Sequence, residues 1–89
     1  MKSIWRYEIP ADDQWHEVNL TSVPLHAAMV FRSGGFGVEF WAERSDGPEI
    51  TYRFQVFGTG YPIPDNAVWW ATCDRGVGGL VFHLYEDPS

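Results

Sequence analysis

The stretch from residue 50 to residue 64 places the tightest constraint on the fold of this chain. Between residues 50 and 56, apolar side chains alternate with polar ones, and the segment then runs into Gly58-Thr59-Gly60-Tyr61-Pro62-Ile63-Pro64. Alternation over this length is typical of a half-buried β-strand, and closely spaced glycines and prolines are typical of the turn that follows one. This segment therefore predicts a small antiparallel β domain.

The same pattern recurs along the chain, and helical periodicity is nearly absent. A short helix is the alternative for residues 25–32, because Ala27-Ala28-Met29 favours helix, although Pro24 and Gly34 leave little room for one. The prediction is all-β, with seven strands separated by Gly, Pro, Asp or Asn. They cover Ser3–Ile9, Gln14–Leu20, Leu25–Arg32, Phe36–Glu43, Glu49–Phe57, Ala67–Cys73 and Gly79–Glu86.

Strands at this spacing favour one β-sandwich or small barrel in which sequence neighbours mostly pair in space. We expect turns at Ala11-Asp12-Asp13 and Ser33-Gly34-Gly35, the first joining a hairpin, and a further hairpin between the fourth and fifth strands. With 89 residues, the chain (1–89) is a single β domain with one core. The fourth strand alternates most cleanly, and its predicted inward side chains are Phe36, Val38, Phe40 and Ala42.

Charge and cysteine content limit the partners and the cellular compartment expected for the chain. The net charge is −6 and Lys2 is the only lysine, so the chain lacks the cations that neutralise phosphates, and no nucleic-acid partner is expected. The acidic surface is suited to a basic protein patch or to imitating a phosphate backbone, but ordinary solubility explains a charge of this size equally well. Cys73 is the only cysteine, which excludes an intrachain disulfide and favours a reducing cytoplasm. We found no apolar run suited to a signal peptide or a membrane span, so no membrane partner is expected.

Residues that carry catalysis or bind metals in other proteins form no recognisable motif here. His16, His26 and His83 lie on three predicted strands without the closely spaced ligand pair of zinc motifs. Most carboxylates fall at turns, where they cap backbone groups or stay hydrated. Cys73 is predicted to be a buried thiol, and a nucleophilic pair with His83 would require the last two strands to form a hairpin. We therefore predict a protein that is not an enzyme and has no metal site or cofactor.

The glycine-rich turn is open to two interpretations. Gly58-Thr59-Gly60 resembles a phosphate-binding loop, but such loops lead into a helix N-terminus and this one leads into Tyr61-Pro62-Ile63-Pro64. The prolines keep the backbone extended. The turn is thus either structural or presents Tyr61 and Ile63 to a peptide or small ligand.

Tryptophan is the strongest sign of function in the sequence. Five tryptophans cannot all enter one small core, and the adjacent Trp69 and Trp70 must point to opposite faces of a strand. Part of the indole surface is expected to contact a protein partner or a second copy of the chain, unless a sandwich uses it to cover its core and edge. Glu39 and Trp41 share the outer side of the fourth strand, which is either a binding face or a solvated one. The predicted binding residues are Glu39, Trp41, Arg53, Tyr61, Ile63 and Trp69.

Three segments together resemble a family of small, uncharacterised actinobacteriophage proteins: Ser3-Ile4-Trp5-Arg6-Tyr7, Val56–Pro64 and Gly79–Glu86. The resemblance spans nearly the whole chain and supplies no activity, cofactor or catalytic residue. It implies a phage product in the cytoplasm of the host, where proteins of this kind frequently bind a host protein or blunt a defence system.

Two hypotheses lead, ahead of an enzyme in third place and a minor virion component in fourth. The leading one is a noncatalytic protein that engages a host protein through an aromatic-rich β surface, alone or as a homodimer. The alternative is a protein that sequesters a small, nucleotide-like ligand in a pocket formed by oligomerisation. That pocket would be lined by tryptophan and by the Gly58–Pro64 turn, and Arg53 and Arg75 would meet an anionic group of the ligand.

Overall fold

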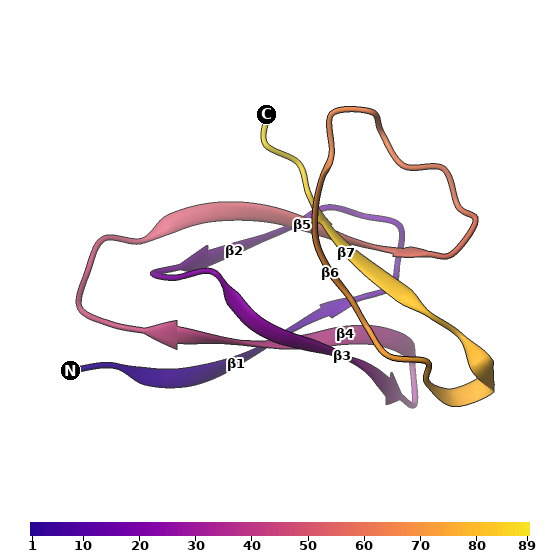
Figure 1. The fold of residues 1–89 in the computed structure, drawn as a ribbon, viewed down its shortest axis with the longest axis horizontal. Helices are drawn as coiled ribbons and strands as arrows, with labels where there is room; N and C mark the ends of the chain where they lie inside the picture. Colours follow the sequence, from indigo (N-terminus) through magenta and orange to yellow (C-terminus); the bar gives the residue numbers. More distant parts are fainter.

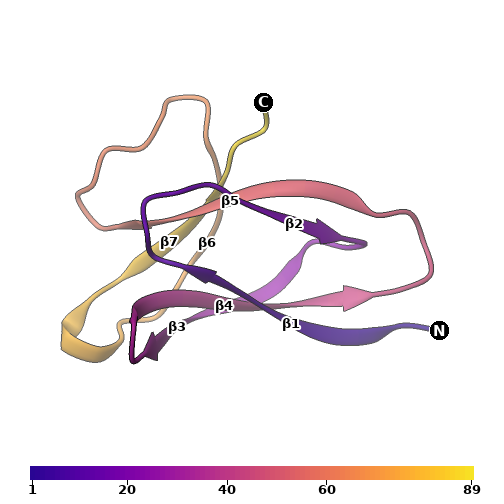
Figure 2. The same ribbon diagram turned by 180° about the vertical axis from the view of Figure 1, so that it is seen from behind.

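Two antiparallel sheets make up the computed structural model, which describes residues 1–89 apart from the side chain of Val77. The sheets lie face to face as two layers, seen from the front in Figure 1 and from behind in Figure 2. The predicted all-β fold class is confirmed. The strands are β1 (Ser3–Pro10), β2 (His16–Leu20), β3 (Pro24–Arg32), β4 (Gly35–Arg44), β5 (Ile50–Gly58), β6 (Val68–Thr72) and β7 (Phe82–Glu86), and one 3-10 turn, η1 (Val77–Gly79), precedes β7.

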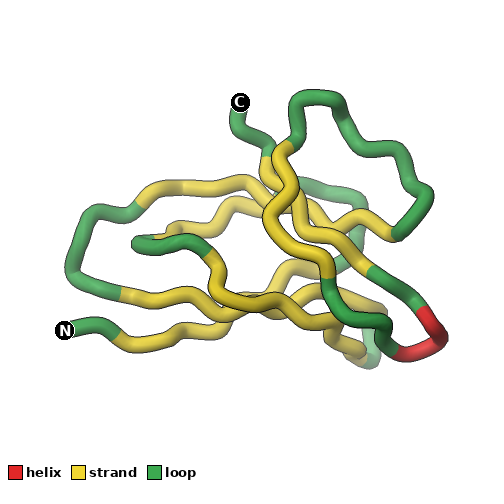
Figure 3. Tube along the Cα trace, in the orientation of Figure 1, coloured by secondary structure: helices red, strands yellow, loops and turns green.

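The pairing of the strands differs from the prediction. The order is β1-β4-β3 in one sheet, here sheet A, and β2-β5-β7-β6 in the other, sheet B. The hairpins expected at Ala11-Asp12-Asp13 and between β4 and β5 are wrong, because at both places the chain crosses from one sheet to the other (Figure 3). The alternation of apolar and polar residues predicts which side of a strand is buried, but it does not predict which strand lies next to it in the sheet. A crossing connection lets consecutive strands bury their apolar sides against each other.

Two pairs of consecutive strands do lie side by side, as expected. β3 and β4 form a hairpin whose turn is Ser33-Gly34, with Arg32 opposite Gly35, so the helical alternative for this segment is wrong. β6 and β7 also pair. β7 begins later than predicted, at Phe82, because Gly78 and Gly79 adopt φ values of 72° and 76°, which a strand does not use.

The core is centred on two phenylalanines from the middle of the sheets. Phe40 of β4 and Phe54 of β5 have no exposed surface, and their rings meet edge to face with centroids 5.5 Å apart. Tyr7 stacks on Phe40 at 5.1 Å, and Trp70 packs edge-on against Phe54 at 5.7 Å. Of the four predicted inward residues of β4, three are buried and Phe36 is half-buried. The other buried members of the core are Ile9, Leu20, Ala27, Val38, Ala42, Val56, Cys73 and Leu84.

β1 and β4 approach closely at Gly37, which pairs with Pro10. A Cβ at this glycine would lie 2.8 Å from the Ile9 carbonyl oxygen and 3.3 Å from the Pro10 Cα. Both are backbone atoms, so a side chain here can be accommodated only if the two strands move apart.

Gly37→Ala is therefore expected to lower the free energy of unfolding by ~1–3 kcal/mol, the usual range for overpacking. The matched control is Gly47→Ala, where the nearest atom to the new Cβ is the Ser45 Oγ at 3.4 Å, and a change within about 0.5 kcal/mol is expected. Urea unfolding of both variants measures the difference. Equal stabilities would contradict the close approach at Gly37.

Tyr7 brings a polar atom into the core. Its hydroxyl is buried and has no hydrogen-bond partner among the described residues. Tyr7→Phe keeps the stack on Phe40 and removes the unpaired hydroxyl, so we expect the free energy of unfolding to rise by about 1 kcal/mol. Tyr61→Phe, at a residue that is 63% exposed, is the control and should leave stability unchanged. A loss of stability in Tyr7→Phe would show that the hydroxyl has a partner.

Candidate functional site

Tryptophans occur in both sheets, with Trp15 directly before β2, and part of the indole surface is exposed, as the sequence predicts. Trp5 is 50% exposed and Trp69 is 57% exposed. Trp69 and Trp70 diverge as expected, since Trp70 packs on Phe54 in the core while Trp69 lies outside. The remaining tryptophans, Trp15, Trp41 and Trp70, are half-buried.

The outer side of sheet B carries a second apolar layer. Alternation with the core residues of β5 and β7 points Phe57 and Tyr85 outward, and Tyr85 lies opposite Trp69 of β6. Trp15 stands edge-on to Phe57 at 6.0 Å, and Phe57 stands edge-on to Tyr85 at 5.7 Å. Phe57 is only 5% exposed although it points away from the core. We call Trp15, Phe57, Trp69 and Tyr85 the aromatic face.

A chain of hydrogen bonds fixes the exposed Trp69. Its indole Nε1 donates to the Thr72 hydroxyl at 2.9 Å, and the Thr72 Oγ1 lies 3.0 Å from the His83 Nδ1. The His83 Nε2 lies 2.9 Å from the Thr59 Oγ1, which also donates to the Val81 carbonyl at 3.3 Å. One arrangement of donors and acceptors satisfies these groups: Thr72 donates to Nδ1, and Nε2–H donates to Thr59. The network thus holds an exposed indole in one orientation.

Arg53, a predicted binding residue, lies beside this face. Its guanidinium is 6.0 Å from the centre of the Trp15 ring, and its Nη1 bonds the Asp87 carboxylate at 2.7 Å. Hydrogen bonds from Ser89 are the main cause of the lowered pKa of Asp87, and the charge of Arg53 adds to it. Arg53 and Trp69 therefore belong to the same sheet and to the surroundings of the same face.

Glu39 and Trp41 lie on the outer side of sheet A. They share the outward side of β4, as predicted, but this places them on the opposite layer from Trp69. The Glu39 carboxylate forms an ion pair with Arg6, and Trp41 stacks on His26 with centroids 6.1 Å apart. This outer side of sheet A is mainly a charged surface.

The same ion-pair cluster extends through Arg6 to Glu8 and Arg32. The Glu8 carboxylate is bonded by Arg32 at 2.9 Å and by Arg6 at 2.7 Å. These hydrogen bonds, that of Arg32 first, lower the pKa of Glu8. The carboxylates here are thus committed to partners within the chain.

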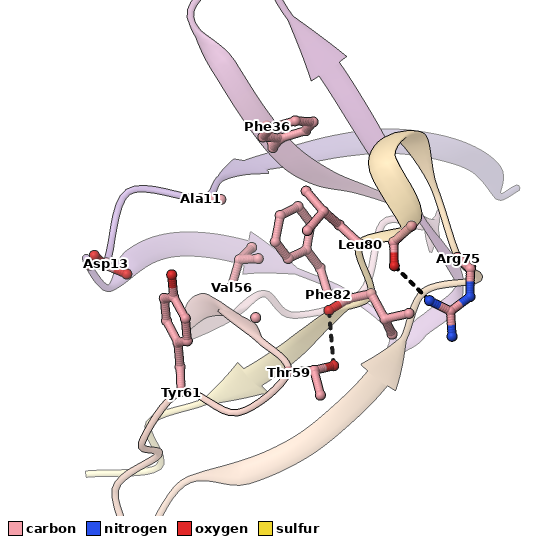
Figure 4. A pocket seen from close by; sticks show the side chains of 12 residues that line it. Ala11, Asp13, Phe36, Val56, Thr59, Tyr61, Arg75, Leu80 and Phe82 are labelled. Atoms are coloured by element: carbon pink, nitrogen blue, oxygen red, sulfur yellow. Dashed lines mark hydrogen bonds between the residues drawn. The ribbon is translucent and has the colours of Figure 1, made fainter.

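Tyr61 lies at a third place, a cleft at one end of the sandwich. Its backbone N–H donates to the Gly58 carbonyl at 3.2 Å, and Gly60 has φ of 92°, so residues 58–61 form a β-turn that needs glycine at its third position. The cleft has a volume of about 560 Å³ and lies between this turn and the β6–β7 connection (Figure 4). Ile63 is half-buried and is not part of its lining. We call this the end cleft; it is lined by Ala11, Asp13, Phe36, Val56, Gly58, Thr59, Tyr61, Arg75, Gly79, Leu80, Val81 and Phe82.

The six predicted binding residues therefore do not form one site. Trp69 and Arg53 lie on sheet B, Glu39 and Trp41 on sheet A, and Tyr61 at the end cleft. Sequence reasoning missed Tyr85 and His83 as neighbours of Trp69, although their alternation with the core residues of the last strand was visible. The contact itself depends on the pairing of β6 with β7.

Cys73 does not form a nucleophilic pair with His83. β6 and β7 pair, but the residue opposite His83 is Thr72, and the Cys73 side chain is 3% exposed within the core. Burial, with a smaller effect of the Asp74 charge, raises the pKa of the thiol to about 11. The prediction of a buried thiol is confirmed, and the thiol is protonated at neutral pH.

The described residues include no group of three or more His, Cys, Asp or Glu side chains placed to hold a metal ion. Within the same part of the chain, no helix has the length and apolar character needed to cross a membrane.

Comparison with known proteins gives one match. Residues 1–89 match the family described as "Domain of unknown function (DUF7352)". Neither a curated protein nor a solved structure matches the chain.

The raised pKa of Cys73 predicts a pH dependence of stability. Because the folded-state pKa of about 11 exceeds the ordinary value of 9.0, the buried thiol contributes its full stabilisation below pH 9.0 and loses it as the pH rises through about 11. Stability should therefore fall more steeply above pH 9 in the native protein than in Cys73→Ala. Urea unfolding of both at pH 8 and pH 10.5 measures this, since all other groups titrate alike in the two proteins. Parallel pH profiles would contradict the shift.

Proposed function

The chain belongs over its whole length to the DUF7352 family, whose function is unknown, and we propose that it is a noncatalytic binding domain that engages a host protein through the aromatic face. The observation that carries this proposal is the state of Trp69. The residue is 57% exposed, and its indole is nevertheless held by Thr72.

An immobilised aromatic side chain is well suited to recognition. Ordering a flexible side chain in an interface costs ~0.5–1.5 kcal/mol, and a side chain that is already ordered avoids part of this cost. Tryptophan and tyrosine are also the residues that most often dominate the binding energy of protein interfaces. Trp69 lies directly opposite Tyr85, so both anchors occur on one surface.

The position of β6 makes Trp69 accessible to a partner. β6 is the edge strand of sheet B, and β7 pairs with it on one side only. The strand has five residues and a register irregularity between Trp69 and Ala71, features that make edges poor templates for strand addition. The contact is therefore proposed to be made by side chains and not by an added strand.

The net charge of the domain bears on which charged residues the surface of the partner carries. With a net charge of −6, the domain favours a protein whose apolar patch is bordered by lysine and arginine. The resemblance to actinobacteriophage proteins supports a host protein in the cytoplasm as this partner. A second copy of the chain is the other candidate for the same face.

Affinity capture followed by a matched pair of variants tests the proposal. Native protein is used as bait in host lysate, the captured protein is identified by mass spectrometry, and its affinity is measured for Trp69→Ala and Trp5→Ala. Trp5 is the control because it is 50% exposed but belongs to β1 of sheet A. Loss of Trp69 should weaken binding by about 30-fold, as expected for an interface anchor, while loss of Trp5 should not.

The outcomes separate the candidates. A captured protein that binds both variants equally, or the absence of any captured protein, would contradict the proposal. Sedimentation of the purified protein tests the second copy, since a dimer that becomes monomeric in Trp69→Ala would assign the aromatic face to self-association. Higher salt should slow association with a basic partner.

A further inference from the structure

We propose that the end cleft is a binding site for a small aromatic molecule with one anionic group at one end and an N–H donor at the other, the chemistry of a nucleoside monophosphate with an amino-substituted base. The site is separate from the proposed protein contact on the aromatic face, although Thr59 lines the cleft and also bonds His83 in the network that holds Trp69. Its volume of about 560 Å³ lies within the ~300–1,000 Å³ typical of small-molecule pockets.

Backbone hydrogen bonds connect the segments that line the cleft. Ala11 N–H donates to the Phe36 carbonyl at 2.9 Å, which ties the β1–β2 connection to β4. Thr59 N–H donates to the Val81 carbonyl at 3.3 Å, which ties the glycine turn to the residues before β7. The site is thus formed within one protomer, so the pocket expected from oligomerisation is not needed for it.

Apolar side chains from both sheets form the interior. Phe36 of β4 and Phe82 of β7 meet edge to face at 5.9 Å, and Phe31 supports Phe36 at 5.1 Å. Val56 lies between Asp13 and Phe82 in the view of Figure 4. A flat nucleobase ring gains favourable stacking energy against aromatic side chains, and it needs no hydrogen bond to do so.

Arg75 supplies the cation at one side of the cleft. Its Nη1 donates to the Gly79 carbonyl at 2.7 Å, and Gly76 N–H donates to the Leu80 carbonyl at 2.9 Å, so the loop that carries it is ordered. The loop also lies close against β3, because a Cβ at Gly76 would be 2.4 Å from the Met29 Cε. One N–H of the guanidinium is used within the loop, and the others remain to bind a phosphate or carboxylate oxygen pair.

Asp13 supplies the opposite charge at the other side. Figure 4 places Asp13 and Tyr61 on one side of the cleft and Arg75 on the other, with Phe82 and Leu80 between them. Asp13 has φ of 62°, a conformation that aspartate and asparagine tolerate better than most residues. Its carboxylate accepts hydrogen bonds from an amino group and repels an anion.

The arrangement of charges selects the ligand class. Among the described residues that line the cleft, Arg75 is the only cation, and both Asp13 and the net charge of −6 oppose further negative charge. A single anionic group at the Arg75 side is therefore favoured over a di- or triphosphate. Arg53 and the tryptophans, which the sequence placed in such a pocket, are not in its lining.

Two-dimensional NMR of the native protein tests the site with AMP as probe. AMP should shift the amide signals of Thr59, Gly60, Gly79 and Leu80 in a saturable manner. Three control ligands are compared with AMP: adenosine lacks the phosphate, purine riboside 5′-monophosphate lacks the amino group, and ATP carries more negative charge. Each should bind at least about tenfold more weakly than AMP. The first two lose a contact with Arg75 or Asp13, and the added charge of ATP is repelled by Asp13. No saturable shift with AMP, or shifts outside the cleft, would overturn the proposal.

Variants assign the two ends of the ligand. Arg75→Gln should weaken the binding of AMP about tenfold or more and leave the binding of adenosine unchanged. Arg75→Lys keeps the positive charge, so it separates the loss of charge from a disruption of the loop. Asp13→Asn keeps the backbone preference and should reduce the advantage of AMP over the analogue without an amino group. Trp5→Ala, a change in sheet A at a residue outside the described lining of the cleft, should leave AMP binding intact. Equal binding of AMP and adenosine to the native protein, or an unchanged AMP affinity in Arg75→Gln, would refute the assignment.

Discussion

The contact between Phe40 and Phe54 is the interaction on which the other features depend. Both rings come from interior strands, β4 of sheet A and β5 of sheet B, and both are fully buried. Their edge-to-face contact joins the two layers at the centre of the molecule, with Tyr7 and Trp70 completing the aromatic cluster. Successive side chains of a strand point to opposite faces of the sheet. With Phe40 and Phe54 turned into the core, the residues next to them in β4 and β5 must therefore point to the outer face.

The aromatic face is a direct consequence of that constraint. With Phe54 and Val56 turned inward, Gln55 and Phe57 of β5 must point outward, and the pairing with β7 sets Tyr85 and His83 against them. Sheet B therefore has apolar layers on both sides, one in the core and one outside. Sheet A differs, since its outer side is occupied by the paired charges of Arg6, Glu8, Glu39 and Arg32 and by the Trp41–His26 stack.

Connections at one end of the sandwich form the end cleft, and among them the β1–β2 connection crosses from one sheet to the other. The β1–β2 connection, the turn after β5 and the β6–β7 connection contribute its walls, together with Phe36 at the start of β4. Thr59 belongs to two structures at once, because it lines the cleft and its hydroxyl bonds His83 in the network that holds Trp69. The proposed ligand site and the proposed protein contact are thus adjacent through one residue while using different chemistry.

From the sequence alone came the all-β class, the inward side of β4, the divergence of Trp69 and Trp70, the buried Cys73 and the surplus of exposed indole, since each follows from alternation and composition within a short segment. The hairpins at residues 11–13 and between β4 and β5 were wrong, and the neighbours of Trp69 were missed. Pairing is decided by contacts between segments distant in the chain, such as Phe40 with Phe54 and Thr72 with His83. No local pattern specifies those contacts, so only the tertiary structure decided that Glu39 and Trp69 lie on opposite layers and that Asp13 and Arg75 border one cleft.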